Sequence, residues 1–445
     1  MTSVSTIAAL ATAPGAGAVS VLRLSGPEAR VILERVFQPL GGDSAWPPRR
    51  LCRGRLIHPS SRRLLDDGLA VWFPGPNSFT GEDSAEIQGH GGLAVSALAL
   101  EAVLAAGAEL ARPGEFTKRA FLNGRLDLAQ AEAVADLVAA RSAAETTLAA
   151  RQLAGGLSAR VEEAAKPLLA ALADLEAAID FSDEVSPPDL AVLSGRLRRE
   201  VQPRLEALLA AGREGLPFRY GLKVTLAGAP NVGKSSLFNA LLGAERALVS
   251  PRPGTTRDYL TAEVVWSGLR VELSDTAGLT ASPADELDEL GQARSREQVA
   301  GADVVLWVRD CASPAEPADW LSPPGRSLEV WNKADLAPPP PGARAELAVS
   351  ARTGLNLAPL KAAVVKLVTG LENPEPPEVA PSFRHQAALR RADGYLKAAL
   401  ADLDEGQPPD ICAFGLRSAL EALGVIRGRA AAEEILNEIF SRFCL

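Results

Sequence analysis

The stretch GAPNVGKSSLFNALLG, residues 228–243, is the most informative motif of the sequence. It contains every fixed position of the pattern G-x-x-x-x-G-K-[ST]. The apolar run 222–227 before it predicts a buried strand, and 235–242 after it predicts a helix. In that context the glycines turn backbone N–H groups toward phosphates at the positive end of a helix dipole. The stretch therefore predicts a phosphate cradle in which Lys234 reaches the β- and γ-phosphates and the Ser235 hydroxyl ligates Mg²⁺.

Three further motifs follow in order, each after an expected strand. Residues 275–278 (DTAG) offer a carboxylate to the Mg²⁺ shell and a glycine N–H to the γ-phosphate. In 332–335 (NKAD), Asp335 can accept hydrogen bonds from the N1–H and the 2-amino group of guanine, which adenine lacks. Ser350-Ala351, after an expected strand at 347–349, would close over the base. Together the motifs predict a GTPase domain.

Composition sets broad limits. The 445 residues allow two to four domains, and 47% hydrophobic content supports sizeable cores. The net charge of −9 argues against a basic surface coat, although a local basic groove stays possible. Three histidines and four cysteines without C-x-x-C spacing argue against zinc or disulfide frameworks. No leader and no run of 18 apolar residues are visible, so we expect a cytoplasmic protein without a membrane partner.

Hydrophobic patterning predicts a multidomain chain. We expect an α+β N-terminal domain, an all-α helical domain in two segments, and an inserted Ras-like α/β P-loop domain, over residues 1–115, 116–220 with 371–445, and 221–370. The last helices are too few for an independent core, so they should pack with 116–213. Further expected elements are strands 6–11, 18–24, 69–73 and 84–88, helices 27–36, 93–106, 126–154, 383–404, 409–423 and 430–443, a break or helix start at Pro167, and linkers 212–220 and 371–382.

The switch region narrows the class. Ras-like enzymes orient the attacking water with a glutamine, where this chain has Leu279. Arg252 and Arg257 lie near the first switch and are either solvated loop charges or transition-state groups. An enzyme that lacks both the glutamine and an arginine finger needs another source of positive charge for the transition state. Asn231 and the segment 250–256 have oxygens that suit a monovalent cation between the phosphates.

The motifs PNVGKSSLFNALL, PGTTRD, DTAGL and NKAD resemble those of the bacterial tRNA-modification GTPase family MnmE, also called TrmE. Outside the GTPase, ATAPGAGAVSVLRLSG, FTGEDSAEIQGHGG, ARPGEFTKRAFLNGRLDLAQAEAVADL and ILNEIFSRFC resemble it too. The resemblance implies a homodimer that hydrolyses GTP in a K⁺-dependent way and binds a tetrahydrofolate one-carbon donor. With the flavoprotein MnmG (GidA), the family modifies C5 of the wobble uridine (U34) of certain tRNAs.

The resemblance also assigns residues. The implied K⁺ ligands are Asn231, Ser250, Arg252 (by its backbone carbonyl) and Thr255, the Mg²⁺ ligands are Ser235 and Thr256, and the folate-binding residues are Arg23, Glu82 and Arg125. The expected GTP contacts are Asn231, Val232, Gly233, Lys234, Ser235, Ser236, Ser250, Thr255, Thr256, Asp275, Thr276, Ala277, Gly278, Asn332, Lys333, Asp335, Ser350, Ala351 and Arg352. Lys234, Thr256 and Asp288 are the candidate catalytic residues.

Two departures from the family pattern stand out. The family's catalytic glutamate falls on Asp288, one methylene shorter, so Glu286 and Glu289 remain alternatives. The family ends F-C-x-G-K, whereas this chain ends Phe443-Cys444-Leu445; we expect Cys444 either to be buried or to point toward the folate pocket.

Two other functions remain open. One is an RNA- or ribosome-assembly GTPase switch, which usually carries a basic RNA-binding module that this acidic chain does not display. The other is a folate-dependent one-carbon transferase that GTP regulates.

Overall fold

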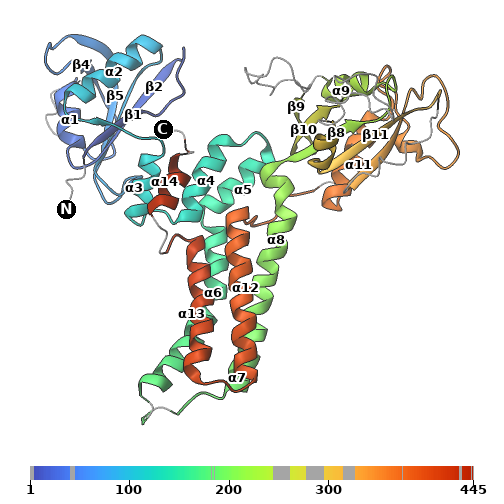
Figure 1. The fold of residues 1–445 in the computed structure, drawn as a ribbon. Coiled ribbons are helices and arrows are strands. Elements are labelled where there is room, and N and C mark those ends of the chain that lie inside the picture. Colours follow the sequence, from blue (N-terminus) through green and yellow to red (C-terminus); the bar gives the residue numbers. More distant parts are fainter. Residues whose placement is uncertain are drawn as a thin grey trace.

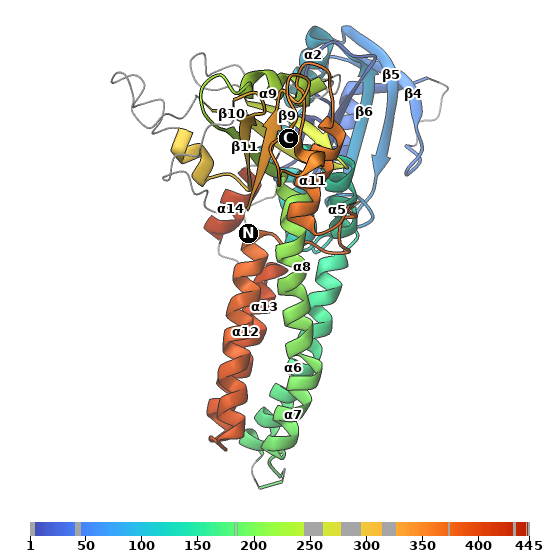
Figure 2. The same ribbon diagram turned by 90° about the vertical axis from the view of Figure 1, so that its right-hand side faces the viewer.

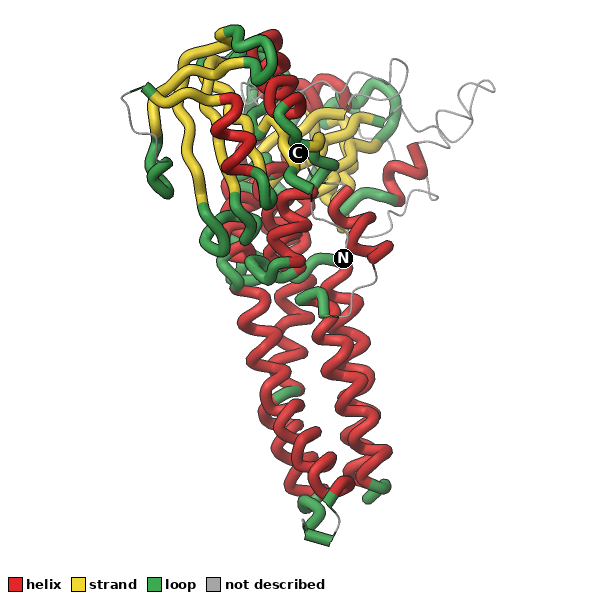
Figure 3. Tube along the Cα trace, turned by 90° about the vertical axis from the view of Figure 1, so that its left-hand side faces the viewer, coloured by secondary structure: helices red, strands yellow, loops and turns green. Residues whose placement is uncertain are grey.

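A computed structural model describes residues 5–40, 46–181, 183–184, 186–243, 261–276, 295–313, 326–372, 374–429, 433–441 and 443. Figure 1 shows a sheet-containing part on either side of the upper half and a long helical bundle below them. Figure 3, coloured by secondary structure, shows that the lower half is helical and that the strands lie in the two upper parts. In the described part of the chain, no helix is both long and apolar enough to cross a bilayer.

The N-terminal part is built on a seven-stranded sheet of order β3-β4-β5-β6-β2-β1-β7, with only β1 and β7 parallel. Its strands are β1 Ile7–Leu10, β2 Val19–Ser25, β3 Phe37–Pro39, β4 Cys52–Ile57, β5 Leu64–Phe73, β6 Ser84–His90 and β7 Glu109–Leu110. The helices α1 (Ala29–Val36) and α2 (Leu93–Ala105) share one core with one face of the sheet. The helix α3 (Glu115–Leu122) packs Phe116 against Ile7 and Ala9, which point to the other face.

Strands β3 and β4 were not predicted. In β4 only every second position is buried along Cys52–Leu56, and two of the outward positions are arginines. A short strand of this kind carries no apolar run for the sequence pattern to reveal.

The helical part gathers segments from both sides of the inserted domain. One core joins residues of α6, α7, α8, α12 and α13, and also includes Ala129 of α4. The elements are α4 Leu128–Ala139, α5 Ala143–Leu153, α6 Gly156–Asp180, α7 Leu190–Glu200, α8 Gln202–Tyr220, α12 Phe383–Asp404, α13 Pro409–Ile426 and α14 Glu433–Ser441.

Three helical expectations were wrong. The single helix at 126–154 is two, because Ser142 caps α5 by accepting from the Glu145 N–H. Pro167 lies inside α6, where the carbonyl it leaves free belongs to the exposed Glu163 and can bond to water.

The expected linker 212–220 is the end of α8. The glycines of this segment do not end the helix but allow other parts of the chain to pack closely against it. A Cβ at Gly215 would lie 2.4 Å from Ala380 Cβ, and one at Gly212 would lie 2.8 Å from Gln386 Cγ. Figure 2 shows α8 rising from the bundle to the second sheet.

The second sheet has the order β12-β11-β8-β10-β9 and is parallel except for the edge strand β9. Its strands are β8 Leu222–Ala227, β9 Thr261–Trp266, β10 Leu269–Asp275, β11 Val304–Asp310 and β12 Arg326–Asn332, accompanied by α9 Lys234–Leu242, η2 Ala345–Leu347 and α11 Leu357–Thr369. The expected strand at 347–349 is wrong: Ala348 forms one isolated bridge to Trp331. Ligands of such sheets bind at the carboxyl ends of the parallel strands.

Candidate functional site: a nucleotide cleft and an N-terminal polar network

The phosphate loop connects β8 to α9, as predicted, and its two glycines have no room for a side chain. Gly228 has a φ of +152°, and a Cβ there would lie 2.3 Å from Val308 O. Gly233 has a φ of +92°, and a Cβ would lie 2.4 Å from Asn332 Nδ2. Both positions therefore require glycine, because a larger residue would push the loop away from β11 and β12.

Lys234 and Asp275 form the charged centre of this loop. Lys234 is 7% exposed, and its Nζ donates to Gly228 O at 3.1 Å and to Ala229 O at 2.9 Å. Burial lowers the pKa of Lys234, and the charge of Asp275 opposes this. Burial likewise raises the pKa of Asp275, opposed by a hydrogen bond from Ser235 and by the charge of Lys234.

The Asp275 carboxylate fits a magnesium site. Its Oδ1 is buried and has no hydrogen-bond partner among the described residues. A water bound to a divalent cation would donate to that oxygen, and the cation's charge would favour the ionised carboxylate. Asp275 therefore suits the outer part of a Mg²⁺ shell, and the Ser235 hydroxyl suits the inner part. Thr276 is structural here, because its Oγ1 donates to Leu226 O at 2.7 Å.

The base-reading motifs meet at the end of β12. Asn332 is 2% exposed and joins two loops: its Nδ2 donates to Val232 O at 3.1 Å, and its Oδ1 accepts from Ala351 N at 3.2 Å. The Ser350 hydroxyl donates to Asp335 Oδ1 at 2.7 Å. Asn332 therefore fixes the spacing between the phosphate loop and the base-closing loop.

The Asp335 carboxylate is held ionised and in place. The Ser350 hydrogen bond is the main cause that lowers the pKa of Asp335, and Arg352, whose Nη2 lies 3.0 Å from Oδ2, adds to it. A charged carboxylate with fixed orientation suits the two N–H donors of guanine. Ser236 is exposed on the first turn of α9.

Sequence reasoning missed Asp310, the last residue of β11. The Nζ of Lys333 lies 2.5 Å from Asp310 Oδ2 and donates to Asn231 O at 2.9 Å. Asn231 has a φ of +63°. Asp310 thus positions Lys333, and Lys333 in turn binds the phosphate loop at Asn231, whose backbone is left-handed. A carboxylate at the end of an apolar run was the sequence feature that could have indicated Asp310.

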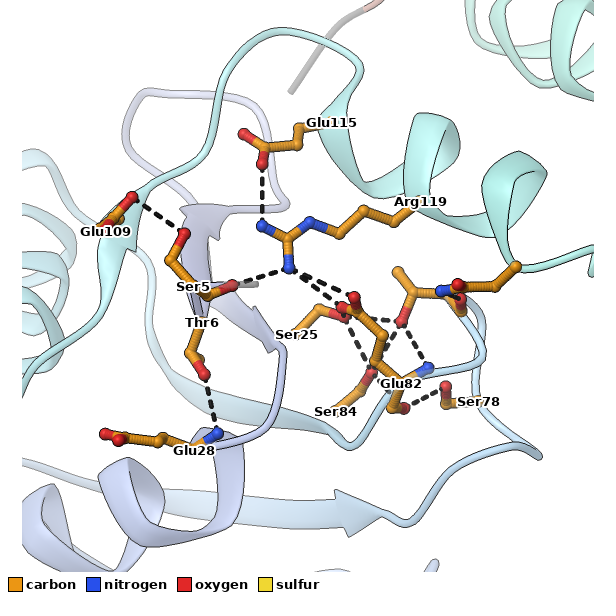
Figure 4. A network of polar contacts seen from close by, with 12 residues as sticks. Ser5, Thr6, Ser25, Glu28, Ser78, Glu82, Ser84, Glu109, Glu115 and Arg119 are labelled. Atoms are coloured by element: carbon orange, nitrogen blue, oxygen red, sulfur yellow. Dashed lines mark hydrogen bonds and ion pairs between the residues drawn. The ribbon is translucent and has the colours of Figure 1, made fainter. Parts of the chain in front are cut away.

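The N-terminal part contains a second polar site, drawn in Figure 4. Glu82 accepts from the Ser25 hydroxyl at 2.7 Å and forms an ion pair with Arg119 at 3.1 Å. Arg119, with a side chain 10% exposed, also pairs with Glu115 at 2.9 Å and donates to Ser5 O at 2.8 Å. Arg119 was not predicted, and it is the residue that fixes the Glu82 carboxylate.

The two predicted arginines differ in their surroundings. Arg23 pairs with Glu86 at 2.8 Å and lies over the rings of Phe79 and Phe116, at 5.5 and 6.0 Å from their centroids. Arg125 is exposed and forms no ion pair with the described residues, and its Cγ would lie 3.2 Å from a Cβ built on Gly81. Arg125 therefore lies beside the loop of Glu82 and is free to meet an anion.

The end of the described chain approaches this site. A Cβ at Gly114 would lie 2.4 Å from Phe440 O and 3.0 Å from Phe443 Cβ, and Gly114 directly precedes α3. Figure 1 shows α14 beside α3 and α4. Several predicted residues lie outside the described residues: Ser250, Arg252, Thr255, Thr256, Arg257, Ala277, Gly278, Leu279, Glu286, Asp288, Glu289 and Cys444.

A glycine-constrained phosphate loop, a buried lysine and aspartate beside it, and an ionised Asp335 held by Ser350 and Arg352 are the features of a P-loop GTPase. Comparisons with known proteins place it more narrowly. The model of the MnmE helical domain matches residues 128–444, and the model of the GTP-binding protein TrmE N-terminus matches residues 6–125. The chain belongs to the MnmE family of tRNA modification GTPases, which confirms the resemblance seen in the sequence.

Named relatives agree over nearly the full length. "tRNA modification GTPase MnmE" of Synechococcus sp. (strain JA-3-3Ab) is 42% identical over 99% of this chain and 98% of its own. The same-named protein of Chloroflexus aurantiacus is 42% identical over 99% of both chains. Among solved structures, a variant of Aquifex aeolicus Era bound to GDP.AlF4- is 25% identical over 39% of this chain and 66% of that chain, with a TM-score of 0.28.

Proposed function

We propose that this enzyme couples K⁺-stimulated GTP hydrolysis to modification of tRNA. In this proposal it acts as a homodimer with the flavoprotein MnmG (GidA) and delivers a tetrahydrofolate one-carbon unit to C5 of the wobble uridine. The supporting observation is that one chain of this family carries both a GTPase cleft and a separate N-terminal network around Glu82. The proposed division of labour follows the four segments 1–115, 116–220, 221–370 and 371–445.

The potassium role rests on Asn231. Its side chain is exposed in the phosphate loop and makes no hydrogen bond to the described residues, while its backbone is held by Lys333. An amide oxygen in that position suits a monovalent cation, which supplies positive charge to the phosphates when bound. Ser250, Arg252 and Thr255 are proposed as the other ligands, with Ser235 and Thr256 on Mg²⁺ and Asp288 as the catalytic carboxylate.

The folate role rests on the chemistry around Glu82. A carboxylate anchored by Arg119 and Ser25 can accept hydrogen bonds from the amino and N–H groups of a pterin edge. The guanidinium of Arg125, which forms no ion pair with the described residues, and that of Arg23, which lies over two aromatic rings, suit the carboxylates of a glutamate tail. Bound folate would supply the one-carbon unit, and these residues would orient it.

Two measurements test the proposal. GTP hydrolysis should be faster in KCl than in NaCl by about tenfold or more, because the cation would stabilise transition-state charge; equal rates would refute the potassium role. Mass spectrometry of wobble uridines should show loss of the C5 substituent in cells that lack this protein and its return on complementation. Retention of the substituent without the protein would refute the tRNA role and favour a GTPase switch.

A further inference from the structure

The strongest local charge of this acidic chain lies on one side of the N-terminal sheet. Residues 49–63 contain six arginines and no lysine, aspartate or glutamate, although the whole chain has a net charge of −9. All six arginines are exposed. Five of them form what we call the arginine patch: Arg50, Arg53, Arg55, Arg62 and Arg63. They lie before β4, on β4 and in the β4–β5 turn.

The charge of the patch is largely uncompensated. Arg53 forms an exposed ion pair with Asp67 at 3.2 Å, and both side chains are about half exposed or more. The other four form no ion pair within the part of the chain that the structure describes. These four guanidinium groups are spread from just before β4 to the turn after it, where an anionic chain could neutralise them.

The geometry of the patch suits an extended chain of anionic groups. Arg53 and Arg55 are two residues apart on one strand, so they point to the same face about 6.6 Å apart. The turn that follows is closed by Arg62 N donating to His58 O at 2.9 Å and His58 N donating to Arg63 O at 2.9 Å. Arginines therefore continue past the end of the strand, and they form a row rather than a pocket.

Protection of a sheet edge does not account for this row. Charged side chains commonly block edge strands, but β4 is already covered by β3 at Gly54, Arg55 and Leu56. Arg50, Arg62 and Arg63 lie outside the strand altogether. Exposed arginines suit phosphate and nucleic-acid recognition, because a planar guanidinium bonds bidentately and stacks on bases.

The patch is also continuous with the candidate folate site. Arg49, next to it, donates from Nη2 to Pro74 O at 3.3 Å and Asn77 O at 3.0 Å. That loop leads directly to Glu82. Figure 1 and Figure 2 show β4 toward the outer side of the N-terminal part, away from the helical bundle.

We propose that the arginine patch binds the phosphate backbone of the tRNA substrate and directs it toward the Glu82 loop. The inference rests on the proposed tRNA role and adds the surface that performs it. Each arginine that neutralises one phosphate releases counterions, so affinity should fall steeply with salt.

The test compares two triple variants that remove equal charge. R50Q/R55Q/R63Q removes three patch arginines that have no ion-pair partner among the described residues. R199Q/R213Q/R391Q removes three exposed arginines of the helical part, equally without ion pairs to described residues. Binding of a labelled, unmodified tRNA transcript is followed by anisotropy from about 50 to about 200 mM NaCl. Nucleotide and K⁺ are left out, so the GTPase cleft does not contribute.

The patch variant should bind the transcript at least about tenfold more weakly at the lower salt, with a slope of log K against log salt that is shallower by about two to three. The control variant should keep the wild-type slope, and both should hydrolyse GTP at the wild-type rate. Equal binding by the two variants would overturn the proposal. So would unchanged RNA binding with a loss of MnmG binding or of the dimer in sedimentation, because the patch would then be a protein interface.

The wobble-uridine analysis distinguishes a wrong assignment of the patch from a wrong assignment of the tRNA role. If cells that carry the patch variant keep the wobble-uridine substituent and the variant binds tRNA normally, only the patch assignment fails. If cells without the protein keep the substituent, the tRNA role itself fails whatever the patch binds.

Discussion

Replacing Asp310 by asparagine should weaken GTP binding although Asp310 belongs to none of the four sequence motifs. The Asp310 carboxylate pairs with Lys333, and Lys333 donates to the backbone of Asn231 in the phosphate loop. Burial raises the pKa of Asp310, but the Lys333 hydrogen bond outweighs it and the pKa is lowered overall. The carboxylate is therefore charged at neutral pH. In Asp310→Asn the amide oxygen can still accept from Ala312 N, so the substitution removes only the negative charge and the acceptor oxygen that face Lys333.

The magnitude follows from the exposure of the pair. A hydrogen bond between charged groups contributes about 1.5–3 kcal/mol. Lys333 is 32% exposed and Asp310 is 12% exposed, so solvent screening favours the lower value, about 1.5 kcal/mol. If that energy holds the loop in its binding conformation, GTP affinity should fall by about tenfold. Because Asn231 is the proposed potassium ligand, stimulation by K⁺ should fall as well.

Asp303→Asn is the matched control. Asp303 precedes the same strand, β11, at the end away from the cleft, and its Oδ2 accepts from Lys223 N at 2.8 Å. Affinity for a fluorescent GTP analogue and the rate ratio in KCl and NaCl are measured for both variants. Asp303→Asn should match the wild type within about twofold. Equal affinity of Asp310→Asn and Asp303→Asn for the GTP analogue would refute a role of Asp310 in holding the phosphate loop.

Three further outcomes are expected. Asp335→Asn should shift preference from GTP toward xanthosine triphosphate in competition assays, because the amide replaces an acceptor by a donor; unchanged GTP affinity would mean that Asp335 does not contact the base. Asp288→Ala should lower GTP turnover by roughly 10²–10⁴ and leave GTP binding intact, whereas loss in Glu289→Ala alone would reassign the role. Acid should destabilise the helical part in two steps. Burial lowers the pKa of His385 below 6.5, so its contribution is complete above pH 6.5 and is lost as pH falls. Burial raises the pKa of Glu132, but the hydrogen bond with His385 and the favourable charges nearby together outweigh burial, and the pKa is lowered from 4.5 to about 2. The stability that ionised Glu132 contributes is therefore lost as the pH falls from 4.5 to about 2. Protection factors for amide hydrogen exchange in α12, corrected for the intrinsic pH dependence of exchange, that stay constant in these two windows would contradict this.

The motifs of the nucleotide cleft could be predicted from the sequence, because each motif is a short contiguous segment. The phosphate loop is a contiguous strand, turn and helix, and a glycine requirement at 228 and 233 is written into one short segment. The end of β10 at Asp275 and of β12 at Asn332 could be placed for the same reason: an apolar run followed by a polar motif marks the carboxyl end of a buried strand.

The contacts between residues that are distant in sequence could be seen only in the folded chain. Arg23 pairs with Glu86, its neighbour in the register of β2 and β6, whereas Glu82 is held by Arg119 from a helix. No local pattern distinguishes these carboxylates, because ion pairing depends on strand register and on where a helix docks. The same holds for Asp310 and for the buried glycines of α8, which look like a linker although α12 packs against Gly212 and the segment before α12 packs against Gly215. Local sequence specifies elements and motifs, and the long-range packing of those elements specifies the partners of each charge.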